Sequence, residues 1–253
     1  AVKCRIKSPV VQHSLEIVFP HHPKLEEKRA LLMQVLCDLG PDSKRAADAT
    51  ENLCQMYNNV VMEYMATKLA GITPRQGNST SEKVKPQNTL DVEETESIKP
   101  KPELGSPMND DTALDMLNRA LNLTEPRAYF RYHRDLRVSL RSITLNNLAC
   151  FYSSCDSPRM ALKSLWQARV LWFDEKKKKN QSANMMASIE EVRTILNMSS
   201  LYNKMGDAEK ALKMLSNACT SMRKNIPPSA NDLFPLALYS LGCTHEHLLQ
   251  WQK

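Results

Sequence analysis

Arginine side chains recur along one short stretch of the chain at a spacing that gathers them on one side of a helix. Successive arginines are 4, 3, 3 and 4 residues apart, and Leu136, Leu140 and Ile143 fall on the opposite side. The five residues of this arginine stripe are Arg127, Arg131, Arg134, Arg137 and Arg141. A guanidinium group binds carboxylate or phosphate through paired hydrogen bonds, so the stripe could dock on an acidic partner. Alternatively, it is a solvated face, or its members have partners within the chain.

Signatures of catalysis and of metal binding are weak by comparison. The six glycines form neither a G-x-G-x-x-G motif nor a phosphate-binding loop, and neither G-x-S-x-G nor H-E-x-x-H occurs. Cys243, His245 and His247 are metal-ligand types, but side chains two residues apart on a helix point in different directions. The sequence therefore predicts no catalytic residues, no metal site and no cofactor.

A local pattern that occurs twice is the clearest long-range feature. Thr144–Leu162 (TLNNLACFYSSCDSPRMAL) and Thr194–Leu212 (TILNMSSLYNKMGDAEKAL) align without a gap, 50 residues apart (194 − 144). Within each copy, the run A-L-x-x-L-x-x-A places small and apolar residues on one helical face. This run begins at Ala161 and at Ala211, and the same lettering begins at Ala113. Such periods are typical of stacked helical units that complete one another's cores.

These residues resemble the tetratricopeptide repeat family, whose unit is a pair of antiparallel helices with small residues where they cross. The family's hydrophobic and small positions correspond to Leu148, Ala149, Tyr152, Ala161, Leu165 and Ala168, and to Met198, Ser199, Tyr202, Ala211, Leu215 and Ala218. The stretch LNNLACFY is most similar to the kinesin light chain variety, which has longer helices than the usual unit. The resemblance covers residues 113 to 253 and implies an all-α fold, a right-handed superhelical solenoid of antiparallel helix pairs.

The resemblance also implies a binding groove. In this family the first helix of each pair lines the concave surface, and the position before the conserved leucine points into it, which corresponds to Asn147 and Asn197. Ser240 takes this position in a further half-copy, and Arg193 lies one turn before Asn197. An amide offers both a donor and an acceptor, so these asparagines would hold an extended peptide backbone. Alternatively, they hydrogen-bond between neighbouring helices.

The chain before the repeats divides into two parts. Residues 1–71 form an N-terminal helical segment, interpretable as a divergent repeat, because apolar spacings of three and four predict two packed helices between residues 24 and 70. Residues 72–111 are rich in Pro, Ser, Thr, Lys and Glu, which is typical of a disordered linker or of a loop inserted between the arms of an interrupted repeat. Residues 112–253 hold the repeats, truncated at the C-terminus.

Composition narrows the classes of partner. There is no apolar stretch of about 18 residues and no signal-like start, so no membrane span is expected. Seven scattered cysteines favour reduced thiols in the cytosol. A net charge of +6 permits attraction to polyanions, but no nucleic-acid-binding motif accompanies it. Lys176 to Lys179 is interpreted as a solvated loop between repeats.

We therefore expect a non-catalytic interaction scaffold or adaptor that binds an extended, acidic peptide in its groove. The kinesin light chain resemblance implies a cytoplasmic adaptor with cytoskeletal or ciliary association. One alternative is a structural subunit of a larger cytoskeletal or ciliary assembly, docked through the arginine stripe. Another is an RNA-binding helical repeat protein, although the missing motifs disfavour nucleic acid.

Overall fold

The computed structural model of the chain describes residues 22–40, 43–70, 108–125, 134–178, 189–224 and 232–250. These residues form helices and connecting turns, without a strand, as the sequence predicts. The eight helices in this part of the chain are α2 (Pro23–Leu39), α3 (Lys44–Leu69), α4 (Asp110–Leu123), α5 (Arg134–Ser154), α6 (Pro158–Lys178), α7 (Ile189–Lys204), α8 (Ala208–Lys224) and α9 (Leu233–Gln250).

Short polar residues and prolines define where several helices begin. Ser43 caps α3 by accepting a hydrogen bond from the Ala46 N–H over 3.1 Å, and Asn109 caps α4 by accepting one from the Thr112 N–H over 2.8 Å. Both side chains satisfy an amide that the first helical turn leaves without a partner. Pro158 is the first residue of α6, a position where proline's missing N–H removes no helical hydrogen bond.

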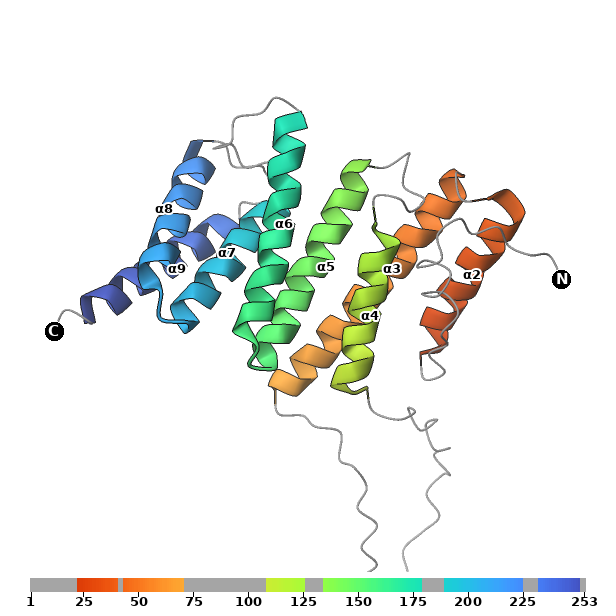
Figure 1. Cartoon of the computed structure of the whole chain (residues 1–253), viewed down its shortest axis with the longest axis horizontal. Coiled ribbons are helices and arrows are strands. Elements are labelled where there is room, and N and C mark those ends of the chain that lie inside the picture. Colours follow the sequence, from red (N-terminus) through yellow and green to blue (C-terminus); the bar gives the residue numbers. More distant parts are fainter. Residues whose placement is uncertain are drawn as a thin grey trace, which may run out of the picture.

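The helices pack in pairs, and the pairs follow one another along the molecule. The first helices of the pairs are α3, α5 and α7, which pack against the second helices α4, α6 and α8, respectively. Each second helix also contacts the next first helix, and α3, α5, α7 and α9 contact one another in that order. Figure 1 shows this succession, with α2 and α9 at opposite ends. The described part of the chain is thus an all-α, repeat-like arrangement.

The turns that end α5 and α7 have matching backbone conformations, 50 residues apart. Asp156 has φ 52° and Gly206 has φ 83°, both in the left-handed region. In the first turn the Ser157 N–H donates to the Tyr152 carbonyl over 2.8 Å, and the equivalent bond in the second turn measures 2.9 Å. Left-handed closure of this kind ends a helix and reverses the chain, so the next helix can pack back on the one before it.

The A-L-x-x-L-x-x-A runs supply the buried faces of the second helices. All nine of their outer alanines and central leucines are at most 1% exposed. They are Ala113, Leu117 and Ala120 on α4, Ala161, Leu165 and Ala168 on α6, and Ala211, Leu215 and Ala218 on α8. The alanines let the paired helices approach closely, while each leucine fills the space beside them. The helical face expected from the sequence is therefore confirmed for all three runs.

Helices from both sides of residues 71–107 share one core. Leu32 on α2 and Leu53 on α3 pack in the same cluster as Leu117 on α4 and Leu148 on α5. Of the linker or inserted loop expected at 72–111, residues 72–107 lie outside the described part of the chain. The last two residues of the expected segment, from Asp110 on, already belong to α4. The two ends of that segment therefore belong to a single packed unit of α3 and α4.

Within the described ranges, no helix is both long and apolar enough to span a lipid bilayer.

Candidate binding site

A buried asparagine on α3 joins this helix to α5. Asn58 is 4% exposed, and its Nδ2 donates to Thr144 Oγ1 over 3.0 Å and to the Cys54 carbonyl over 2.9 Å. Its Oδ1 accepts a hydrogen bond from Asn147 Nδ2 over 2.8 Å. The whole side-chain amide thus has partners, as burial requires. We call this arrangement of Asn58, Thr144 and Asn147 the first clamp.

The same arrangement joins α5 to α7. Asn146, 7% exposed, donates Nδ2 to Thr194 Oγ1 over 2.8 Å and to the Ser142 carbonyl over 2.9 Å. Its Oδ1 accepts from Asn197 Nδ2 over 2.8 Å. Atom for atom, this second clamp of Asn146, Thr194 and Asn197 repeats the first. Hydrogen bonds of this kind depend on alignment, so the clamps fix how far each first helix is shifted along its neighbour.

The step from α7 to α9 lacks the clamp. Leu196 stands 50 residues after Asn146, and Ala237 stands 43 residues after Thr194 in the half-copy, so an apolar pair replaces the polar one. Leu196 and Ala237 lie in one buried cluster. A different bond, from Asn203 Nδ2 to Thr244 Oγ1 over 2.8 Å, joins the two helices. The half-buried Ser240 contributes its carbonyl as an acceptor for Thr244.

Asn147 and Asn197 therefore each donate a hydrogen bond to the preceding first helix. This contact between helices is the alternative to groove binding that the sequence left open. Sequence reasoning missed Asn58 and Asn146, the buried centres of the two clamps. The sequence does contain a signal for them. Each is the first residue of an Asn-Asn pair, and a tyrosine follows six residues later: Tyr64 on α3 and Tyr152 on α5.

A cavity of about 470 Å³ opens where α3, α5, α6 and α7 meet. Its lining comes from residues far apart in the sequence: Met65 and Leu69 on α3, Ala149, Cys150, Ser153 and Ser154 on α5, Ala161 and Leu165 on α6, and Asn197, Ser200, Leu201 and Lys204 on α7. Three successive first helices thus contribute, together with the buried face of one second helix. Small side chains at this junction, such as Ala149 and Ala161, leave the space open.

The cavity combines an apolar interior with polar groups from two helices. Met65 and Leu165 are buried, whereas Ser154, Ser200 and Lys204 are exposed. Lys204 is the cation among the lining residues, with about half of its side chain exposed; its Nζ lies 3.2 Å from the Ser153 carbonyl and 3.6 Å from Asp156 Oδ1. Such a cavity suits an apolar side chain whose neighbour carries polar or negative groups.

Of the residues expected in a groove, Asn197 lines this cavity. Asn147 and Ser240 belong to the neighbouring helix contacts instead, and Arg193 is exposed on α7 one turn before Asn197, outside the lining. The structure thus brings Asn197 together with Lys204 and two serines on α5, a combination that the sequence pattern did not single out.

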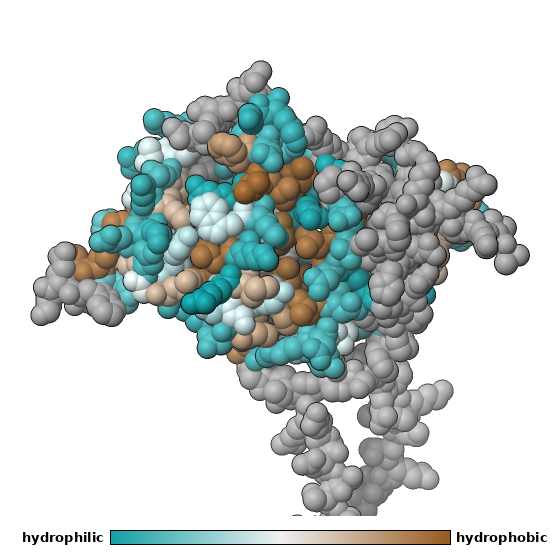
Figure 2. All heavy atoms as spheres, viewed as in Figure 1, coloured by the Kyte–Doolittle hydropathy of each residue, from teal (hydrophilic) through white to brown (hydrophobic). Residues whose placement is uncertain are grey.

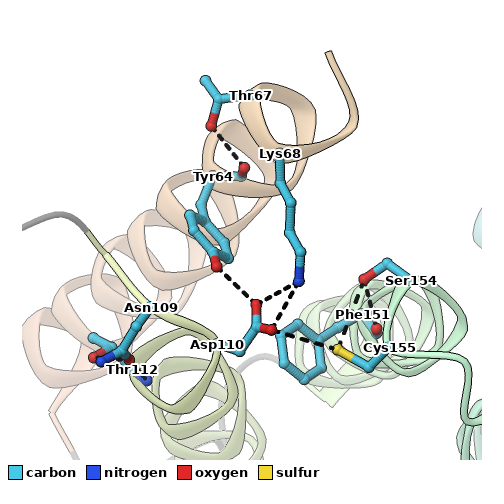
Figure 3. A network of polar contacts seen from close by, with 9 residues as sticks. All are labelled: Tyr64, Thr67, Lys68, Asn109, Asp110, Thr112, Phe151, Ser154 and Cys155. Carbon is cyan, nitrogen blue, oxygen red and sulfur yellow. Dashed lines mark hydrogen bonds and ion pairs between the residues drawn. The ribbon is translucent and has the colours of Figure 1, made fainter. Parts of the chain in front are cut away.

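A polar network lies beside the cavity, where α3 ends and α4 begins (Figure 3). Asp110 accepts from Tyr64 Oη over 2.7 Å and from Lys68 Nζ over 2.7 and 2.8 Å, and Cys155 Sγ lies 3.9 Å from its second oxygen. The hydrogen bonds from Lys68 and Tyr64 lower the pKa of Asp110. Burial, followed by the bond to Asp110, raises the pKa of Tyr64 to about 12. The network holds together both ends of the segment between α3 and α4.

The arginine stripe is described only in part. Arg127 and Arg131 lie outside the described residues, as does the side chain of Arg134. Arg141 Nη1 donates to the Leu121 carbonyl near the end of α4 over 2.8 Å, and burial lowers its pKa. Arg137 is half-buried and has interactions of its own. Of the alternatives that the sequence left open for the stripe, the structure therefore shows a partner within the chain for Arg141.

Lys176 is buried on α6 and forms an ion pair with Glu191 on α7. The expectation of a solvated loop beginning at this lysine is wrong, because α6 continues to Lys178 and uses Lys176 to pair with the next helix. Cys243 and His245 lie on α9, and no group of three His, Cys, Asp or Glu residues in the described part of the chain is arranged to hold a metal ion.

Comparison with models of protein families, with curated proteins and with solved structures yields no match.

Proposed function

We propose that the chain is a non-catalytic interaction scaffold, a right-handed solenoid of antiparallel helix pairs similar to tetratricopeptide repeats, that binds an extended segment of a protein partner in the cavity between α3 and α7. The observation that carries the proposal is the composition of this cavity: three successive first helices meet there around an apolar interior with hydroxyl, amide and ammonium groups among its lining residues. A cavity of about 470 Å³ has room for a large apolar side chain.

The polar lining determines what should flank that side chain. Lys204 would attract a carboxylate, whereas Ser153, Ser154 and Ser200 offer hydroxyl groups to a peptide backbone. Among the residues that the structure describes, no acidic side chain lines the cavity. The preferred segment therefore carries an aromatic or aliphatic residue next to Asp or Glu. Asn197 takes part through its Oδ1 and through the second N–H of its Nδ2, since the other N–H is donated to Asn146.

Selection from an unbiased library of random peptides, with the full chain as target, tests this function. Enriched peptides should share a large apolar residue beside an acidic one. Ser200→Phe should abolish their binding, because this exposed residue at the cavity could then fill it without disturbing the core. Thr220→Phe on α8 is the matched control, since it adds the same ring to an exposed position outside the cavity lining.

A second variant tests the charge. Lys204→Glu should weaken the binding of acidic peptides by about tenfold or more. The binding of peptides with Asn or Gln in place of the acid should change much less. Lys24→Glu on α2 makes the same charge reversal at an exposed position outside the cavity lining and should leave all affinities unchanged. Peptides that bind Ser200→Phe and wild type equally would place the interaction elsewhere and refute the proposed site.

A further inference from the structure

The outer face of α6 carries an apolar stripe that the other described residues leave exposed. Trp166, Val170 and Phe173 are 45, 53 and 59% exposed, at spacings of four and three residues. They lie opposite the buried positions of the same helix, such as Leu165 and Ala168. Figure 2, viewed as Figure 1, shows apolar atoms on the surface over and beside α6. At about 1.5 Å per residue, the stripe extends for about 10 Å along the helix.

Positive charges stand at both ends of the stripe. Arg159 and Lys163 precede it and Lys177 and Lys178 follow it, all exposed, while Asp174 is the exposed acid of α6. Arg169 lies with its guanidinium carbon 5.4 Å from the centre of the Trp166 ring, a cation–π contact that holds the indole in place while leaving it accessible.

The neighbouring second helix α8 extends the positive surface. Its exposed residues include Lys213, Arg223 and Lys224, against Glu209. By contrast, α4 begins with Asp110 and Asp111. Among the second helices, positive charge is therefore concentrated on α6 and α8 and not on α4.

We propose that this outer face of α6 binds the surface of an anionic lipid membrane, with Trp166, Val170 and Phe173 entering the headgroup region and the flanking lysines and arginines contacting lipid phosphate and carboxylate groups. Aromatic side chains favour the membrane interface, and basic residues are attracted to anionic lipid. Since no helix in the described residues can span a bilayer, the contact would be peripheral.

The geometry favours this partner over two others. A second copy of the chain would bring its own lysines and arginines against the same positive surface, which repels. A rigid acidic protein would need a groove to fit the stripe, because the three side chains form a ridge on the outermost side of one helix. A lipid headgroup layer adapts to a ridge, and it supplies negative charge along the whole length of the face.

Sedimentation of the full chain with lipid vesicles tests the proposal. We expect binding to phosphatidylcholine vesicles that contain a third phosphatidylserine, no binding to phosphatidylcholine alone, and loss of binding in about 1 M salt, where the Debye length is about 3 Å. Trp166→Ser with Phe173→Ser should weaken binding by about tenfold or more, as should Lys163→Glu with Lys177→Glu. All four positions are exposed, and circular dichroism verifies that the variants fold.

Matched controls alter equally exposed residues elsewhere. Leu236→Ser with Leu249→Ser on α9, 48 and 61% exposed in the wild type, and Lys24→Glu with Lys44→Glu near the start of the described chain should leave vesicle binding within about twofold. Peptides that occupy the cavity should still bind the α6 variants, so this proposal and the proposed function can fail separately.

Tryptophan fluorescence provides an independent readout. The difference between wild type and Trp166→Phe isolates this indole from Trp172, which is buried and hydrogen-bonded to Ser142. That difference spectrum should shift to shorter wavelength on anionic vesicles. The proposal is overturned if wild type does not bind anionic vesicles, if the stripe variants bind as well as wild type, or if the difference spectrum is unchanged. Binding of the same face to single-stranded RNA or to an acidic protein, without vesicle binding, would assign it to that partner instead.

Discussion

Asn147 donates its side-chain amide to Asn58, a residue 89 positions earlier, and thereby joins α5 to α3 across a segment of the chain that separates the two arms of one helix pair. One helix pair later, Asn197 makes the same bond to Asn146. The equivalence of these two bonds links α3, which lies in the segment that the sequence analysis interprets as a divergent repeat, to the packing scheme of α5 and the helices after it. It also makes the clamp a unit whose energy can be measured.

Exchanging Asn146 and Thr194 of the second clamp for the apolar pair found at the next step should leave the free energy of unfolding nearly unchanged, although each single exchange lowers it. Asn146→Leu, or Thr194→Ala alone, leaves a buried polar group without one of its partners and should lower the free energy of unfolding by about 1–3 kcal/mol. The double variant reproduces the Leu196 and Ala237 arrangement and should recover most of this loss.

Chemical denaturation of wild type, both single variants and the double variant gives the coupling between the two sites. Asn217→Leu on α8 serves as a control, since this exposed residue should change stability by less than about 0.5 kcal/mol. A double variant as unstable as the sum of the two singles would show that the clamp cannot be replaced by apolar contact.

The two matching turns should respond in opposite directions to exchange of their left-handed residues. Asp156→Gly should stabilise the chain by about 0.5–1 kcal/mol, because glycine adopts φ 52° without the penalty borne by a residue with a side chain. The exposed Asp156 carboxylate gives up only a long ion pair with Lys204, 3.6 Å, in return.

Gly206→Ala should destabilise the chain by about 1 kcal/mol. In the described part of the chain, no atom beyond Gly206 and its two chain neighbours lies within 4 Å of the added Cβ, so the backbone angle of φ 83° produces the effect. Thermal unfolding at fixed pH measures both variants. Equal changes in the two turns would mean that neither φ value governs the stability of its turn.

The stability of the folded chain should depend on pH through the carboxyl group of Asp110. Its pKa is lowered in the folded chain by hydrogen bonds from Lys68 and Tyr64, so the folded state favours the carboxylate more than the unfolded state does. This contribution is present above the unfolded pKa of about 3.9 and is lost as the pH falls through the lower, folded value. Asp110→Asn should therefore destabilise the chain at neutral pH and match wild type in strong acid.

Urea denaturation at several pH values distinguishes this effect from a general loss of packing, because a packing defect would persist at low pH. The expected difference is small, about 1 kcal/mol or less, since the Asp110 and Lys68 side chains are 45 and 36% exposed. Asp111→Asn, an exposed neighbour in the same first turn of α4, is the control for the helix dipole.

Thiol alkylation should separate the cysteines by burial. Cys37, Cys155 and Cys243 are exposed and should react with iodoacetamide first. Burial raises the pKa of Cys54 to about 12, partly offset by its hydrogen bond to Thr144. This lowers its thiolate fraction at neutral pH by about a thousandfold relative to an exposed thiol.

Mass spectrometry of the labelled chain should therefore find Cys54 modified only under conditions that unfold α3 and α5. Labelling of Cys54 at the rate of Cys155 would show that the helices around the first clamp open easily. Reaction of every cysteine in denaturant is the control for reagent access.

The spacing of small and apolar residues predicts the buried faces of the second helices, but not the contacts between distant helices. The small and apolar residues of α4, α6 and α8 were recognised because a helix buries one face at a fixed spacing, and this burial is a local property. The clamps depend on pairs such as Asn58 and Thr144, 86 residues apart, whose contact exists only once three helices have packed. The cavity is less predictable still, since residues such as Ala149 and Ala161 create it by being small.

The arginines show what residue spacing alone leaves open. A regular spacing indicates a shared face, but not what that face meets. Arg141 follows the stripe pattern and yet donates to the carbonyl of Leu121, because α4 ends beside it. On α6, the sequence pattern emphasised the inward alanines and leucines, whereas Trp166 and Phe173 could be recognised as outward only after the burial of α6 was known.

The difference between the two clamped steps and the last, unclamped step has a mechanical consequence. Hydrogen bonds between buried amides hold α3, α5 and α7 at fixed positions along one another, because a shift of one residue would break them. At the last step, Leu196 and Ala237 make contacts without a required direction, and the hydrogen bond from Asn203 Nδ2 to Thr244 Oγ1 is what fixes α9 along α7. Each clamped step has two such bonds between the helices, made by Asn58 with Thr144 and Asn147, and by Asn146 with Thr194 and Asn197. We therefore expect α9 to shift along α7 at a lower energetic cost than α3, α5 and α7 shift along one another, so that bending of the array occurs first at α9.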